Sequence, residues 1–116
     1  MAAKRALSST IAAGLTLDRV GKLMRNNLWV KRKYTILSAC VVGSVARGTD
    51  HDNSDIDIAV IIPKVRGKRA ITVTEQYHAR FSADHQKPHF NGRQVDLQFF
   101  YENDPALKSY DTIPLK

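Results

Sequence analysis

Two aspartates, Asp55 and Asp57, stand one residue apart at the start of an apolar run that ends at residue 62. Side chains two positions apart in a β-strand lie on the same face of the sheet, so both carboxylates are expected on one side and Ile56 in the packed layer. Paired carboxylates suit a hard cation such as Mg²⁺, which accepts one or two carboxylates, keeps waters and binds substrate phosphates. The spacing therefore predicts a metal site at the start of this strand.

A second apolar run, residues 36–42, ends at Gly43-Ser44 and is typical of a buried strand. Residues 44–47 are then expected to form a single helical turn. Glycine lets a backbone approach a phosphate closely, the first amides of a helix are unpaired donors, and the Ser44 hydroxyl adds one more donor. Arg47 either adds positive charge to this phosphate site or supports the loop, and both interpretations stay open.

These two segments resemble a known family signature. The segments are Gly43-Ser44-Val45-Ala46-Arg47-Gly48 and Ser54-Asp55-Ile56-Asp57-Ile58. They are similar to the signature of the DNA polymerase β-like nucleotidyltransferase superfamily, and within it to the minimal nucleotidyltransferases of bacteria, archaea and their viruses. The spacing shows no insertion or deletion against that pattern. The family also carries a third carboxylate on a later strand, where this chain has Asp96 within residues 95–100. The resemblance covers residues 36 to 100, and a composite motif of this length is specific.

The resemblance implies an α/β (α+β) fold, with a small mixed sheet that carries the three aspartates at one edge and helices packed on one face. It implies transfer of a nucleoside monophosphate from a nucleoside triphosphate, with ATP as the expected nucleotide, to an acceptor hydroxyl, and release of pyrophosphate. Asp55, Asp57 and Asp96 would be the catalytic residues and the ligands of two Mg²⁺ ions, with Mn²⁺ as an alternative ion. Gly43 and Ser44, with Arg47, would bind the phosphates.

The same residues are also compatible with other interpretations. Aspartates near Asn53 and Ser54 also form solvated turns, and Asp96 would suit the polar face of any alternating strand. The acceptor hydroxyl could belong to a partner protein, as in toxin-antitoxin pairs where such enzymes adenylylate the toxin, to RNA or DNA, or to a small molecule. The rival hypothesis is a catalytically inactive module with the same fold that binds a protein or nucleic-acid partner. The presence of all three carboxylates argues against that rival.

Length and charge indicate one domain with uneven electrostatics. The 116 residues allow a single core, which we predict to span residues 16–116 behind a basic N-terminal arm, residues 1–15. The net charge of +7 is concentrated in residues 1–33 and 63–93, whereas residues 34–62 and 94–116 are acidic overall. Basic surfaces around an acidic centre favour a polyanionic substrate. No apolar run could span a bilayer, and the single cysteine, Cys40, requires no oxidising compartment, so a cytoplasmic location is expected.

The remaining elements are predicted more coarsely. Thr16 is the expected N-cap of a helix that runs to residue 28. Residues 70–83 are ambiguous, with a helix favoured over 74–81. Asn91-Gly92 indicates a type I′ hairpin that delivers Asp96 beside the first acidic strand. Residues 102–105 are expected to form a loop and residues 111–116 an irregular tail or a short edge strand. The spacing of the histidines His78, His85 and His89 does not suit zinc.

Overall fold

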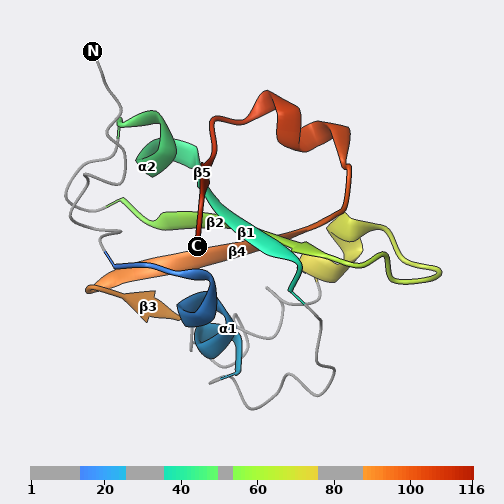
Figure 1. The fold of residues 1–116 in the computed structure, drawn as a ribbon, viewed down its shortest axis with the longest axis horizontal. Coiled ribbons are helices and arrows are strands. Elements are labelled where there is room, and N and C mark those ends of the chain that lie inside the picture. Colours follow the sequence, from blue (N-terminus) through green and yellow to red (C-terminus); the bar gives the residue numbers. More distant parts are fainter. Residues whose placement is uncertain (1–13, 26–35, 50–53, 76–87) are drawn as a thin grey trace.

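A computed structural model describes residues 14–25, 36–49, 54–75 and 88–116, which fold around a five-stranded sheet (Figure 1). In chain order the elements are α1 (Leu17–Arg25), β1 (Ser38–Val42), α2 (Gly43–Arg47), β2 (Ile56–Ile62), a helical segment at 70–75, β3 (His89–Phe90), β4 (Arg93–Tyr101), the 3-10 helix η3 (Pro105–Ser109) and β5 (Ile113–Pro114). The strand order is β3-β4-β2-β1-β5.

The sheet is mixed, as the sequence predicts. Strands β2 and β4 pair in parallel, while β1 pairs antiparallel with both β2 and β5, and β3 pairs antiparallel with β4. A parallel pair needs a crossover, and residues 63–92 supply it. Because the strand order is β3-β4-β2-β1-β5, β2 and β4 are interior strands. The sheet edge at which Asp57 and Asp96 lie is formed by the starts of these strands and not by an outer strand.

The two faces of the sheet differ. Alternate residues of β2 and β4, among them Ile56, Ile58 and Phe99, are buried against α1, α2 and the helical segment at 70–75. The opposite face carries a smaller apolar cluster, in which Ala59, Ile61 and Phe100 are joined by Val42 of β1, with Cys40 and Leu107 packed against it. In Figure 1, α1 and η3 accordingly lie on opposite sides of the sheet. The aspartates share the less covered face.

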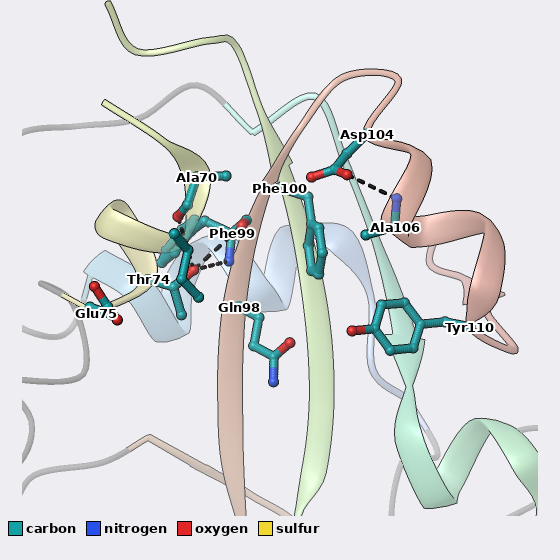
Figure 2. Close-up of a pocket in the computed structure, with 10 residues that line it drawn as sticks. Ala70, Thr74, Glu75, Gln98, Phe99, Phe100, Asp104, Ala106 and Tyr110 are labelled. Atoms are coloured by element: carbon teal, nitrogen blue, oxygen red, sulfur yellow. Dashed lines mark hydrogen bonds between the residues drawn. The ribbon is translucent and has the colours of Figure 1, made fainter. Parts of the chain in front are cut away.

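The helical segment at 70–75 covers the edge of β4 that β3 does not reach. Thr74 is 7% exposed, and its hydroxyl oxygen accepts a hydrogen bond from the Phe99 amide at 2.9 Å (Figure 2). The hydroxyl also lies 3.3 Å from the Ala70 carbonyl, to which it can donate. A side chain therefore supplies a hydrogen-bond acceptor to a buried β4 amide. This helix begins at residue 70, four residues before the helix that the sequence favours.

Thr74→Val should therefore destabilise the protein. Valine has a similar shape but leaves the buried Phe99 amide without its acceptor, which costs about 1–3 kcal/mol of unfolding free energy. Urea denaturation would measure the loss. Thr72→Val, in the same helix at a half-buried position, is the matched control and should change the free energy of unfolding by much less. Equal losses in both variants would show that helix propensity, and not the Phe99 contact, is responsible.

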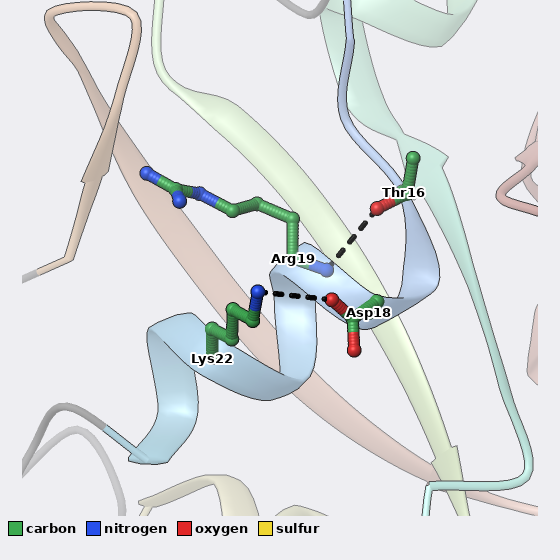
Figure 3. Close-up of polar contacts among 4 residues, drawn as sticks. All are labelled: Thr16, Asp18, Arg19 and Lys22. Atoms are coloured by element: carbon green, nitrogen blue, oxygen red, sulfur yellow. Dashed lines mark hydrogen bonds and ion pairs between the residues drawn. The ribbon is translucent and has the colours of Figure 1, made fainter.

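Helix α1 begins at the predicted cap. The Thr16 hydroxyl oxygen accepts from the Arg19 amide at 3.2 Å, and Lys22 pairs with Asp18 at 3.3 Å on the exposed side (Figure 3). The capping bond stabilises the helix by about 1 kcal/mol, whereas an exposed pair of this kind contributes less. Val20 and Leu23 are buried in the larger cluster. The predicted end of the helix, residues 26–28, lies outside the described residues.

The hairpin and the tail follow the sequence prediction. Asn91 and Gly92 have φ values of 51° and 76°, the conformation of a type I′ turn, and they join β3 to β4. The tail forms an edge strand, since β5 pairs with β1. The predicted loop, residues 102–105, extends to Asp104, and η3 begins at Pro105; the Asp104 carboxylate caps η3 by accepting from the Ala106 amide at 2.9 Å.

The predicted N-terminal arm lies outside the described residues except for Gly14 and Leu15, and Leu15 is buried in the larger cluster. His78 and His85 also lie outside them. None of the helices in the described ranges combines the length and apolar character that crossing a membrane would need.

Candidate active site

The acidic pair lies where β2 begins. Ile56 is fully buried in the larger cluster, which turns Asp57 to the opposite, less covered face, where it is half-buried. Asp55 precedes the strand and is exposed. One Asp55 oxygen, Oδ2, accepts from Gln94 Nε2 at 3.3 Å, so this carboxylate is directed toward β4. The predicted division between packed Ile56 and outward Asp57 is thus present.

Asp96 is brought beside Asp57 by strand register. In the parallel pair of β2 and β4 the Cα partner of Asp57 is Asp96, although the two are 39 positions apart in sequence. Neighbouring strands lie about 4.8 Å apart and paired residues share a face, so the two carboxylates are adjacent. Asp96 is half-buried. The sequence placed Asp96 next to the first acidic strand, and the register agrees; its role as a metal ligand stays a prediction.

Gly43 lies directly against Asp57. Its φ is +70°, and a Cβ built on it would lie 3.1 Å from the Asp57 carboxyl carbon and closer still to Oδ2. The pairing of Val42 with Asp57 in the β1–β2 ladder creates this contact, because β1 ends at that point. Only glycine combines the left-handed conformation with this approach. The Gly-Ser loop and the acidic strand are therefore one structural unit.

Helix α2 is a single short turn anchored by buried side chains. Val45 and Ala46 are buried, Ser44 is half-buried and Arg47 is exposed. Gly48, at φ +75°, ends the helix, and the Thr49 amide donates to the Ser44 carbonyl at 2.9 Å. The N-cap residue of α2, Val42, makes no side-chain capping hydrogen bond. The predicted helical turn is therefore confirmed, and it begins at Gly43, which lies against the Asp57 carboxylate.

Charge accumulates around Asp57. Burial raises the pKa of its carboxyl group, and the negative charges of Asp96 and Asp55 raise it further, while the Arg47 guanidinium opposes the shift. All three neighbours are thus close enough to act on Asp57. Adjacent carboxylates in a half-buried position are stabilised by a cation, and oxygen donors of this kind fit Mg²⁺ or Mn²⁺.

The side chains are not arranged as a complete ligand set. Within the described ranges, no three His, Cys, Asp or Glu side chains converge as a group that could hold a metal ion. Asp55 is instead hydrogen-bonded to Gln94. The backbone register and the Gly43 contact fix the positions of Asp57 and Asp96, whereas their coordination of an ion, and that of Asp55, stays a prediction.

Two residues at the site were missed in the sequence. Gln94 donates a hydrogen bond to Asp55, and Arg93 Nη1 donates to the Ser54 carbonyl at 3.3 Å. Side chains at the start of β4 thus hydrogen-bond to the residues just before β2. The side-chain period of two along a strand places Gln94 on the same face as Asp96, and this was the signal available in the sequence.

Asp50 and Asp52, between the two motif segments, lie outside the described residues. Burial raises the pKa of the Cys40 thiol, which disfavours a nucleophilic thiolate.

A family model described as a nucleotidyltransferase domain matches residues 27–113. This range includes Gly43, Ser44 and all three aspartates. Neither a curated protein nor a solved structure matches the chain significantly.

Proposed function

Because the chain belongs to the nucleotidyltransferase domain family, we propose that it transfers a nucleoside monophosphate from a nucleoside triphosphate, with ATP as the expected donor, to an acceptor hydroxyl. The acceptor oxygen forms a bond to the α-phosphorus while the bond from that phosphorus to the bridging oxygen breaks. Pyrophosphate leaves, and the hydroxyl proton passes to a carboxylate or to water. We place the reaction in the cytoplasm, where thiols such as Cys40 stay reduced.

Gly43 and Ser44 bind the outer phosphates in this proposal. Gly43 has no Cβ, so a phosphate can approach its backbone, and the Ser44 hydroxyl donates a further hydrogen bond. The apolar side chain of the N-cap residue Val42 supports this role, because it cannot accept from the first amides of α2. Arg47, exposed one turn later, adds positive charge to the same region.

Asp55, Asp57 and Asp96 would hold Mg²⁺ ions, with Mn²⁺ as the alternative. When bound, two such ions would supply Lewis-acid stabilisation of the charge on the attacking and leaving oxygens and would lower the pKa of the acceptor hydroxyl. Asp57 occupies the central position, since it contacts Gly43 on one side and is the register partner of Asp96 on the other. Gln94 orients Asp55, as outer partners commonly do for metal ligands.

The observation that carries this proposal is the contact between Gly43 and Asp57. It joins the phosphate-binding loop to the carboxylates at a distance that leaves no room for a side chain. A charged strand end that was merely solvated would have no reason to pack against a left-handed glycine. The hydroxyl of a partner protein such as a toxin, or of RNA or DNA, then completes the reaction.

Labelled transfer tests the proposal. The purified protein, incubated with Mg²⁺, each α-labelled triphosphate in turn and cell extract, should release pyrophosphate and place label in protein or nucleic acid. Asp96→Asn should lower both signals by about a hundredfold or more, because it removes several kcal/mol of transition-state stabilisation. Asp111→Asn, an exposed aspartate in the C-terminal segment, is the matched control and should leave both unchanged.

Wild-type protein that binds no triphosphate and releases no pyrophosphate would contradict the proposal and favour the rival hypothesis, a catalytically inactive binding module. Equal activity of Asp96→Asn and Asp111→Asn would leave transfer in place but remove Asp96 from it.

A further inference from the structure

A groove of about 450 Å³ crosses the same face of the sheet beyond the candidate active site. Figure 2 shows its construction: Gln98 and Phe100 of β4 form the floor, the helix at 70–75 forms one wall, and η3 with Tyr110 forms the other. Its volume is in the range of sites that hold a large side chain or a small molecule. Because alternate residues share a face, Gln98 and Phe100 continue the row that begins with Asp96.

Exposed apolar side chains line the groove. Three large hydrophobic side chains in the described ranges are markedly exposed, and two of them, Ile71 at 51% and Tyr110 at 42%, line this groove from opposite walls. The Tyr110 ring packs edge-to-face on Phe100, with 6.1 Å between the centroids, so the ring is held in position. Exposed apolar side chains grouped around a hollow are typical of a binding surface.

The position of the groove relates it to the acceptor and not to the triphosphate. Gly43 contacts Asp57 from the β1 side, whereas Asp96 lies on the β4 side of Asp57. Gln98 is two residues beyond Asp96 on the same face, about 7 Å along the strand. The carboxylates therefore lie between the proposed phosphate loop and the groove. A molecule in the groove would therefore reach Asp96 from the β4 side and not from the side of Gly43.

The charges at the groove select the kind of acceptor. Its two charged lining residues, Glu75 and Asp104, are both acidic, although the chain carries a net charge of +7. Asp104 uses one oxygen, Oδ1, to cap η3, and Glu75 is exposed on the facing wall. Carboxylates on both walls repel a phosphate backbone and attract a cation. A nucleic acid is thus disfavoured at this surface.

Resting on the proposed function, we propose that this groove docks the acceptor as a protein segment, in which an apolar side chain packs between Ile71 and Tyr110 and a neighbouring Lys or Arg faces Glu75 and Asp104. The segment carries its hydroxyl toward Asp96. The groove thereby decides in favour of a protein acceptor over RNA or DNA.

Two synthetic peptide libraries of identical format test this inference. Both carry a central Tyr, Ser or Thr beside Leu or Phe, and they differ only in flanking Lys or Glu. Binding is followed by amide chemical shifts of the full chain, and transfer by label from ATP with Mg²⁺. We expect the Lys library to bind about five- to tenfold more tightly, with shifts at Ile71, Ala106 and Tyr110.

Substitutions at exposed positions locate the effect. Glu75→Lys should reduce the preference for the Lys library to about twofold or less, and Ile71→Ser should weaken peptide binding about fivefold. Glu102→Lys and Leu37→Ser make the same chemical changes at exposed positions outside the groove and should behave as wild type. Affinity for ATP, measured by calorimetry, should change less than twofold in all four variants.

Several results would overturn the inference. These are the absence of binding by either library, equal binding of both, equal effects of groove and control variants, or preferential labelling of RNA or DNA oligomers. Loss of ATP affinity in Ile71→Ser would show that the groove holds the nucleoside instead. Because peptide shifts are measured without turnover, a failure of the groove is distinguishable from a failure of the proposed function, which would appear as loss of ATP binding and pyrophosphate release by wild type.

Discussion

Gly43→Ala is expected to abolish nucleotidyl transfer and to destabilise the protein at the same time. The new Cβ would collide with the Asp57 carboxylate, so Asp57 or the start of α2 must move. Moving either one separates the phosphate loop from the carboxylates. We therefore expect activity to fall by at least about a hundredfold, since catalysis of this kind depends on positioning. Pyrophosphate release and calorimetric ATP titration would measure the loss.

Gly67→Ala provides the matched control for stability. Gly67 has φ +79°, close to that of Gly43, but a Cβ there meets nothing within 4 Å. Both substitutions carry the left-handed penalty of about 1–2 kcal/mol. Only Gly43→Ala adds a steric clash, which should cost a further 1–3 kcal/mol, roughly the cost of overpacking. Equal unfolding free energies for the two variants would contradict the contact with Asp57.

The contribution of Ser44 should be tested with Gly43 unchanged. Combining Gly43→Ala with Ser44→Ala would mix loss of phosphate contacts with displacement of Asp57. Ser44→Ala alone removes one hydroxyl donor from a half-buried position and leaves the Gly43 backbone in place. It should therefore weaken ATP binding by the value of one hydrogen bond, about 1 kcal/mol, with little effect on folding. An unchanged ATP affinity would remove Ser44 from the phosphate site.

Local patterns in the sequence were sufficient for much of the fold. The Asn91-Gly92 turn fixes the β3–β4 register through backbone conformation alone, and Thr16 specifies where α1 begins. The apolar run after Asp57 specifies a buried strand whatever its neighbours are. These features depend on residues that are close in sequence, which is why periodicity and turn chemistry reveal them.

Contacts between segments that are distant in sequence were harder to predict. The register of Asp57 with Asp96 was expected only in outline, and the support of Asp55 by Gln94 was missed, because strand pairing at such separation is set by the whole core. The helix at 70–75 begins earlier than the sequence pattern predicts, since Val73 packs into the larger cluster and the Thr74 hydroxyl accepts a hydrogen bond from the Phe99 amide of β4. The groove arises from three separate segments, and no single motif encodes it.

Asp57→Asn is expected to eliminate transfer while increasing stability at neutral pH. Burial, followed by the charges of Asp96 and Asp55, raises the pKa of Asp57 above its ordinary value of 3.8. The folded state therefore favours the protonated acid. Its stabilising contribution is complete below the unfolded pKa and is lost as the pH rises through the higher folded pKa. At neutral pH the ionised Asp57 thus costs stability, which asparagine removes.

The gain should be modest, about 0.5–1 kcal/mol, because a half-exposed carboxylate is screened by solvent. Urea denaturation in mildly acidic and in neutral buffer should show the gain chiefly at neutral pH. Asp55→Asn, at an exposed position, should also lose transfer, and the double variant should be inactive and folded.

Divalent ions should link the stability of the protein to the proposed function of Asp57. An ion that binds the folded state raises stability by mass action, so Mg²⁺ should raise the melting temperature of wild type at neutral pH. The rise should shrink as the pH falls through the raised pKa of Asp57, because protonation removes the ligand. Asp57→Asn should show almost no rise at any pH. A melting temperature that responds equally to Mg²⁺ in wild type and in Asp57→Asn would place the ion elsewhere and leave Asp57 without a metal to hold.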